Sequence, residues 1–202
     1  LFKPQILVES TFGDSHPGSA HLDQFVEEGM RAIADNGGKG ARNYVTDICD
    51  GIAQGHDGIN YSLAHRDMMA NMVEIHANAT PFDGGVFIAS CDKSMPAMLM
   101  GIGKLKDMSA IVVTGGVMEA HTIPAKYVEQ DPSCAINELL TLEQIGKFDA
   151  QEKRGEIPKE QLDYYKQHAC PSCGACSFMG TASTMQIMAE ALGLMLPGTA
   201  LM

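Results

Sequence analysis

The chain is short of several features that would place it in a class at once. No run of apolar residues reaches the roughly 18 that a membrane span requires, so no membrane partner is expected. Basic residues are scarce: 14 Lys and Arg face 25 Asp and Glu, and the formal net charge of −11 argues against nucleic acid or anionic lipid as the main partner. The opening LFKPQILVES lacks a basic region followed by an apolar block, so it does not resemble a signal peptide, and we expect a cytoplasmic protein.

The chain does contain enough apolar material for a domain-sized core, since 45% of its 202 residues are hydrophobic. It starts with Leu1 rather than methionine and stops at PGTALM without a closing polar segment. We therefore expect residues 1–202 to be a fragment of a longer protein, in which part of the active site comes from elsewhere.

Apolar runs that alternate with helical patterns predict an α/β fold with a mainly parallel sheet, covered by helices on both faces in three layers. In such sheets ligands bind beyond the carboxyl ends of the strands, where Asp50, Cys91 and Gly115-Gly116 fall. Strands are expected at 4–10, 42–48, 84–90 and 109–116, and helices from Ala20 (with Leu22, Val26, Met30 and Ile33), at Ala64–Asn78 (with Met68, Met72 and Ile75 on one face), at 96–105 and within 177–198 (with Met185, Met188 and Leu192).

Residues 120–169 differ in composition from the rest, being rich in Glu, Lys, Asp and Gln. We interpret them as a largely helical surface excursion rather than a separate domain.

The cysteines suggest metal or redox chemistry rather than disulfides, because the chain has no secretory signal. CPSCGAC places Cys170, Cys173 and Cys176 at spacings of three, just before a helix whose N-terminus favours thiolates. A zinc ribbon would need a second CxxC pair, which the sequence lacks. An iron–sulfur cluster can draw a distant ligand, and Cys91 is the candidate. The alternative is a buried small hydrophobe, which is the favoured interpretation for Cys134.

Two carboxylates also stand at predicted strand ends, each directly after a cysteine. Asp50 and Asp92 could together hold Mg²⁺, or each could be a helix cap or turn former. Lys93 could be their salt-bridge partner or, carbamylated by CO₂, a third oxygen ligand. The three nearby histidines are interpreted as surface or capping residues: His21, His56 and His65.

Four motifs in order resemble the dihydroxy-acid dehydratase and phosphogluconate dehydratase family: DGIAQGHDGINYSL, SCDKSMPAMLMG, TGGVMEA and CPSCGACSFMGTASTMQIMAEALGLMLPG. The resemblance runs from about Lys3 to the last residue and covers the N-terminal part of such an enzyme. It implies a hydro-lyase that removes water from a small-molecule 2,3-dihydroxy carboxylic acid to give a 2-keto acid. It implies an iron–sulfur cluster, [2Fe–2S] or [4Fe–4S], and Mg²⁺ as cofactors, and we expect a homodimer or homotetramer.

Carried over from that family, Cys91 and Cys176 match the cluster cysteines. Asp50 and Asp92 match the magnesium ligands, and Lys93 matches the lysine that is carbamylated to complete them. The resemblance implies no catalytic base in this chain, because the family's proton-abstracting serine and a further magnesium-binding glutamate belong to a C-terminal domain that residues 1–202 do not include.

The chain departs from the family pattern at two positions. Many members have a cysteine in the loop HPGSAHL, where this chain has Gly18. The third thiolate must then come from Cys173, Cys170 or Cys49, in that order of preference, or the cluster is of the four-iron kind. Val117 replaces the family's usual proline, which should alter its loop only slightly.

The sequence leaves the substrate and two rival functions open. GHDGINYSL favours the enzyme of branched-chain amino-acid biosynthesis, whereas FMGTASTM is nearer to members that act on sugar acids such as aldonates or phosphogluconate. A non-enzymatic iron–sulfur or zinc module would use CPSCGAC alone. A redox enzyme that cycles a Cys170–Cys173 disulfide would need its CxxC after the first strand, and here it lies late in the chain.

Overall fold

The computed structural model describes residues 2–130 and 139–202, and their centre is a parallel four-stranded sheet in the order β2-β1-β3-β4. Side chains alternate across the sheet, so Leu7 and Phe87 face one side while Val8 and Ile88 face the other. All four are at most 1% exposed, so the sheet is buried on both faces. The strands are β1 (Gln5–Ser10), β2 (Lys39–Tyr44), β3 (Gly84–Ala89) and β4 (Ser109–Thr114).

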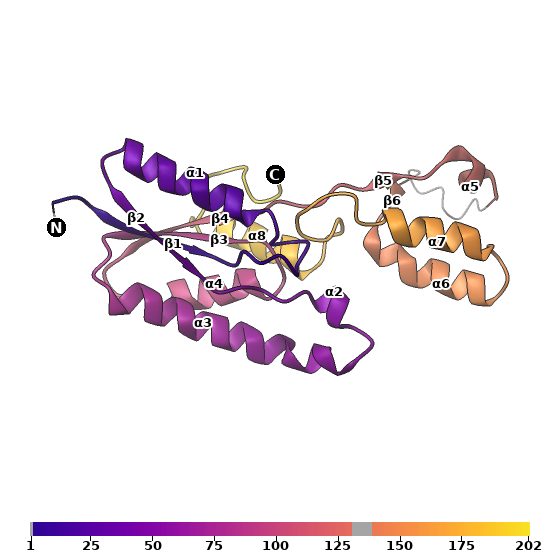
Figure 1. Ribbon diagram of the computed structural model, residues 1–202, viewed down its shortest axis with the longest axis horizontal. Helices are drawn as coiled ribbons and strands as arrows, with labels where there is room; N and C mark the ends of the chain where they lie inside the picture. The colour runs from indigo at the N-terminus through magenta and orange to yellow at the C-terminus, as the bar shows by residue number, and fades with distance from the viewer. Residues whose placement is uncertain (1, 131–138) are drawn as a thin grey trace.

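Helices cover both faces of this sheet, as Figure 1 shows. α1 packs on the Val8 face through Leu22 and Val26, which are fully buried. α3, α4 and α8 share one core with Leu7 and Phe87 on the opposite face. The predicted three-layer α/β fold is confirmed. The covering helices are α1 (Leu22–Asp35), α3 (Ser62–Ala79), α4 (Ser94–Ile102) and α8 (Thr181–Ala191).

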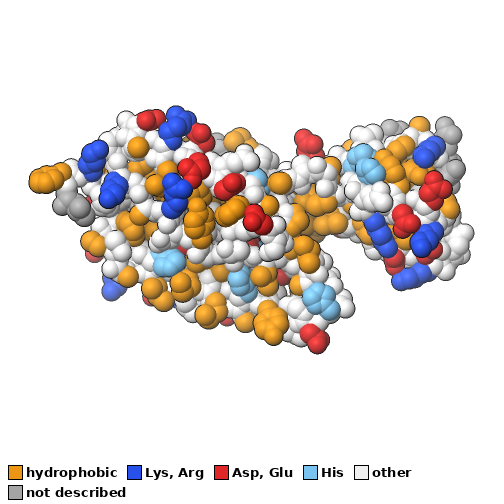
Figure 2. All heavy atoms as spheres, viewed as in Figure 1, with side chains coloured by type: hydrophobic (Ala, Val, Ile, Leu, Met, Phe, Trp, Pro, Cys, Tyr) orange, Lys and Arg blue, Asp and Glu red, His pale blue; other side chains and the backbone are white. Residues whose placement is uncertain are grey.

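The buried face of α3 is not the face with Met68, Met72 and Ile75 that the sequence pattern predicted. Met68 and Ile75 are 62% and 56% exposed, and Figure 2 shows hydrophobic side chains on the surface over α3. The buried stripe lies one position further along, with small residues among its members: Met69, Ala70, Val73 and Ala77. Both stripes have helical spacing, and the one with small side chains permits the closer approach. α4 packs closely against α3, since a Cβ on Gly101 would lie 2.5 Å from Val73 Cγ1.

β2 begins and ends earlier than the predicted strand at 42–48. Its register with β1 runs from Gln5 opposite Lys39 to Ser10 opposite Tyr44, so the length of β1 sets where β2 stops. Residues 45–48 instead continue as a loop beyond the sheet edge, followed by the short α2 (Asp50–Ala53) and the 3-10 helix η1 (Asp57–Tyr61). This loop carries polar side chains past the end of the strand.

Residues 121–130 and 139–168 form a lobe that projects from the sheet domain (Figure 1). The lobe has its own apolar core, and Figure 2 shows charged side chains over its surface. Cys134 lies outside the described residues. The lobe's elements are β5 (His121–Thr122), α5 (Ala125–Gln130), β6 (Leu139–Leu140), η3 (Leu142–Gln144), α6 (Ile145–Lys153) and α7 (Lys159–His168). Its core residues are Ile123, Tyr127, Leu140, Phe148, Ile157, Leu162, Tyr165 and Ala169.

Within the described ranges, no helix of either part is both long and apolar enough to cross a membrane.

Candidate metal and cluster site

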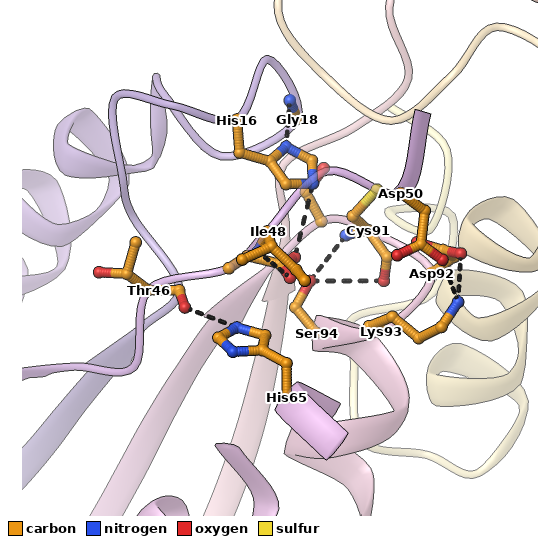
Figure 3. A network of polar contacts seen from close by, with 12 residues as sticks. His16, Gly18, Thr46, Ile48, Asp50, His65, Cys91, Asp92, Lys93 and Ser94 are labelled. Atoms are coloured by element: carbon orange, nitrogen blue, oxygen red, sulfur yellow. Dashed lines mark hydrogen bonds and ion pairs between the residues drawn. The ribbon is translucent and has the colours of Figure 1, made fainter. Parts of the chain in front are cut away.

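The loops that follow β2 and β3 bring three charged side chains together at the carboxyl edge of the sheet. The Lys93 ammonium donates to Asp50 Oδ2 and to Asp92 Oδ2, each at 2.6 Å (Figure 3). Ser62, the first residue of α3, adds a hydroxyl that donates to the same Asp50 oxygen at 2.9 Å. β4 ends at this edge as well, because the Gly115 amide donates to the Ala89 carbonyl at the end of β3. The predicted convergence of these strand ends is confirmed.

The electrostatics of this group follow from two carboxylates that share one ammonium. Burial opposes ionisation of Asp50, but hydrogen bonds from Lys93 and Ser62 outweigh it and lower the pKa of Asp50. Burial alone would favour the neutral amine of Lys93, but its bonds to Asp50 and Asp92 raise the Lys93 pKa. Asp50 and Lys93 are therefore charged at neutral pH, and the Lys93 ammonium lies between the two carboxylates.

The same carboxylates could accept a metal ion at this point. Asp50 Oδ1 is buried and has no hydrogen-bond partner, so one oxygen of the pair is available to a hard cation. Nevertheless, among the described residues no three His, Cys, Asp or Glu side chains come close enough to hold a single ion by themselves. A magnesium site here therefore needs a ligand beyond Asp50 and Asp92, from modified Lys93, the substrate, water or another part of the protein.

Cys91 lies next to this group but points into the protein. The residue is 7% exposed and packs against Ala175 and Ala182. Its backbone amide donates to Ser94 Oγ at 2.9 Å, which fixes the turn into α4. Burial, together with the negative charges of Asp47 and Asp92, raises the pKa of the Cys91 thiol. A metal must therefore displace the proton for this sulfur to become a ligand.

The CPSCGAC segment lies against the turn that follows β4. The Ala175 amide donates to the Gly116 carbonyl at 3.0 Å, and Ala175 is the residue that contacts Cys91. This brings the next residue, Cys176, to the Cys91 side of the site. Burial raises the pKa of the Cys176 thiol, and the nearby Cys49 and Asp92 raise it further. The described cysteines are all free thiols.

Sequence reasoning missed a buried pair behind Cys91. His16 Nε2 lies 3.7 Å from Asp47 Oδ2, and both residues are at most 1% exposed (Figure 3 shows His16). His16 Nδ1 accepts the Gly18 amide at 2.8 Å, so the ring proton is on Nε2 and faces the carboxylate. Burial raises the pKa of Asp47, against the opposing effect of His16. The only sequence signal is that two polar residues stand in loops after neighbouring strands.

The three histidines that the sequence marked as structural make backbone contacts. His56 accepts the Gly58 amide and so caps η1, as predicted. His21 Nε2 lies 2.8 Å from the Gly115 carbonyl, and His65 Nε2 lies 2.9 Å from the Thr46 carbonyl. His21 and His65 each link two separate segments at the carboxyl edge of the sheet, whereas the contacts of His56 are local.

Comparison with known proteins gives a consistent result over the whole chain. The model of the dihydroxy-acid/6-phosphogluconate dehydratase N-terminal family matches residues 3–202. Dihydroxy-acid dehydratases from Syntrophobacter fumaroxidans and Caldanaerobacter subterraneus are 39% and 40% identical over 198 residues, 98% of this chain. That of Pyrococcus abyssi is 38% identical over 202 residues, 99% of the chain. The chain spans about a third of the length of these relatives: 33% of the first two and 34% of the third.

Proposed function

The chain belongs to the dihydroxy-acid and 6-phosphogluconate dehydratase family, and from this we propose that it is the N-terminal, metal-binding domain of a carbon–oxygen hydro-lyase. The substrate is a 2,3-dihydroxy carboxylic acid and the product a 2-keto acid. The observation that carries the proposal is the meeting of Asp50, Asp92 and Lys93 beside the buried thiol of Cys91. Carboxylate oxygens next to a thiol support the proposal, because a two-metal dehydratase would need hard and soft ligands side by side.

The residues fit two different cofactors. Asp50 and Asp92 would hold Mg²⁺, and Lys93 would become its third oxygen ligand if its ammonium lost a proton and the neutral amine added CO₂ to form a carbamate. Cys91 and Cys176 would hold an iron–sulfur cluster through thiolates. When bound, the two cofactors supply Lewis acids that polarise the substrate's carboxylate and hydroxyl groups.

Neighbouring side chains of this chain orient the proposed ligands at this edge. In the structure, Ser62 holds Asp50 by a hydrogen bond, and Ser94 holds the backbone at Cys91, so both ligands are oriented before any cofactor binds. Burial of Cys91 keeps most water away from its sulfur. We assign no proton-abstracting base to these 202 residues.

We propose the dihydroxy acid of branched-chain amino-acid biosynthesis as the substrate. The motif GHDGINYSL supports it, as do the relatives, whose names are all dihydroxy-acid dehydratase. The second candidate is a sugar acid, which the segment FMGTASTM favours. A comparison of kcat/KM for the two substrate classes on the full-length protein separates them.

The free cysteines are in keeping with a cytoplasmic enzyme.

The test uses two substitutions at neighbouring residues in the full-length protein, purified without oxygen. Cys91→Ser should lose iron and sulfide, because a hydroxyl is a poor replacement for a soft thiolate. Asp92→Asn should keep the cluster's visible absorbance but need more Mg²⁺ for the same rate, because it removes one charged oxygen ligand. Iron content and the Mg²⁺ dependence of keto-acid formation are measured for both.

The rival functions give different results in the same experiment. A cysteine-cluster module that uses CPSCGAC alone would keep its iron in Cys91→Ser and would not respond to Asp92→Asn. Normal iron in Cys91→Ser would remove this cysteine from the cluster. An unchanged Mg²⁺ dependence in Asp92→Asn would remove the second metal.

A further inference from the structure

We propose that Cys49 is the third protein ligand of the iron–sulfur cluster, together with Cys91 and Cys176. The inference rests on the proposed function, because it assumes that a cluster is bound. It reverses the order of preference that the sequence suggests, in which Cys173 comes first and Cys49 last.

The loop after β1 cannot supply the ligand. The residue there is Gly18, and a Cβ at this position would lie 2.7 Å from His16 Cε1 and 3.0 Å from His16 Nδ1. His16 cannot easily move away, since it is 1% exposed and is held by the Gly18 amide on one side and faces Asp47 on the other. The histidine ring therefore takes up the space next to position 18, and the missing thiolate must come from another segment.

The other two cysteines of CPSCGAC are poorly placed. Cys173 is exposed, whereas Cys91 is buried. Gly174 follows with a φ of 121°, and its amide donates to the Pro17 carbonyl, so the chain turns sharply between Cys173 and Cys176. Cys170 is also exposed, and its sulfur lies 3.6 Å from the thioether of Met118. Of this segment, only Cys176 follows directly on a residue that contacts Cys91.

Cys49 comes from the same edge as Cys91 and in an equivalent setting. Cys49 precedes Asp50 as Cys91 precedes Asp92, and the two carboxylates share the Lys93 ammonium at 2.6 Å each. The two cysteines are therefore each one residue from the same ion-paired group. Cys49 is the N-cap of α2, its side chain makes no capping hydrogen bond, and it is only partly buried. The Cys49 thiol is therefore partly accessible at this edge and is not used to cap α2.

The cluster's ligands need not all meet at one point. Among the described residues, no three His, Cys, Asp or Glu side chains come close enough to hold a single ion. A cluster is wider than one ion, so its thiolates need not approach as closely as the ligands of a single metal would.

The experiment compares Cys49→Ser with the matched control Cys173→Ser in the full-length protein, purified without oxygen. We expect Cys49→Ser to lose most of its iron and acid-labile sulfide, with a fall in visible absorbance. Cys173→Ser should keep the wild-type content of both. Far-UV circular dichroism verifies that each variant is folded. Any other combination of the two results overturns the proposal.

A second measurement needs no variant and covers the case in which Cys49→Ser fails to fold. Iodoacetamide labelling of the wild-type protein, read by mass spectrometry, is compared before and after a chelator removes the iron. Cys49 should become reactive only after removal, whereas Cys173 should react in both states. Labelling of Cys49 in the iron-loaded protein would refute the assignment. A wild-type protein that binds no iron would instead refute the proposed function itself, and that result is distinct from the others.

Discussion

Glu9 is the basis of a quantitative prediction about stability and pH. This carboxylate on β1 is 0% exposed, and its oxygens lie 3.0 and 3.1 Å from Nδ1 of His76 on α3. Burial raises the pKa of Glu9 from 4.5 to about 7, although the charge and hydrogen bond of His76 act in the opposite direction. Between these two pH values the folded protein holds a proton that the unfolded chain has released.

The sign and size of the effect follow from this difference. Since the folded-state pKa is the higher one, the contribution of Glu9 to stability is fully present below pH 4.5 and is lost as the pH rises through 7. At roughly 1.4 kcal/mol for each pKa unit, the step from 4.5 to about 7 corresponds to about 3 kcal/mol in the free energy of unfolding. A loss of this order is a large part of the stability of an ordinary domain.

The substitution Glu9→Gln should remove this dependence. The amide oxygen of glutamine can still accept a hydrogen bond from His76 but does not titrate. Urea unfolding at several pH values gives the free energy for both proteins, and the variant should gain about 3 kcal/mol on the wild type between pH 4.5 and pH 8. Glu27→Gln, at a side chain that is 62% exposed, is the control and should follow the wild type. Parallel curves for Glu9→Gln and wild type would show that Glu9 ionises normally and that its burial has no effect on stability.

Three further outcomes can be checked directly. Lys93→Met leaves Asp50 and Asp92 facing each other without a cation, so its melting temperature should fall in EDTA and recover when Mg²⁺ is added; equal melting temperatures in both buffers would contradict the site. Gly101→Ala should cost about 1–3 kcal/mol because the new methyl group would overlap a valine of α3, whereas Gly103→Ala, with no contact under 3.4 Å, should cost less; equal costs would contradict the close packing of α4 on α3. Residues 1–202 alone should form no keto acid in a coupled assay, because we assign them no general base, and turnover by this segment would refute that assignment.

The main features of the fold could be predicted because they depend on local patterns. Strands β1, β3 and β4 each contain a short apolar run, and runs of this kind next to helical patterns predict a parallel sheet. The choice of buried face on α3 could not be predicted in this way. Met68 and Met69 belong to stripes of the same helical period, and only the position of the sheet and α4 decides which one is covered.

Part of the candidate site could likewise be predicted from the sequence, and part could not. Asp50, Asp92 and Lys93 could be brought together from the sequence because the carboxyl ends of parallel strands share one edge, and the structure joins them by ion pairs. His16 and Asp47 could not, because their contact depends on how a loop folds back over the edge. The order that puts Cys173 before Cys49 stays a prediction; the turn at Gly174, with its positive φ, is a feature of the backbone that the spacing of the cysteines does not reveal.

In the lobe, residues that pack together are close along the chain, whereas in the sheet they are far apart (Figure 1). β1 can pair with β3 only after a long loop has closed, since Ile6 lies opposite Gly84. The helices α6 and α7 of the lobe, by contrast, follow one another directly and pack together. Contacts between distant residues slow folding because the entropy of loop closure must be overcome first. We therefore expect the lobe to fold early and on its own, while closure of the parallel sheet, and with it the edge that carries both Cys-Asp pairs, is the slow step.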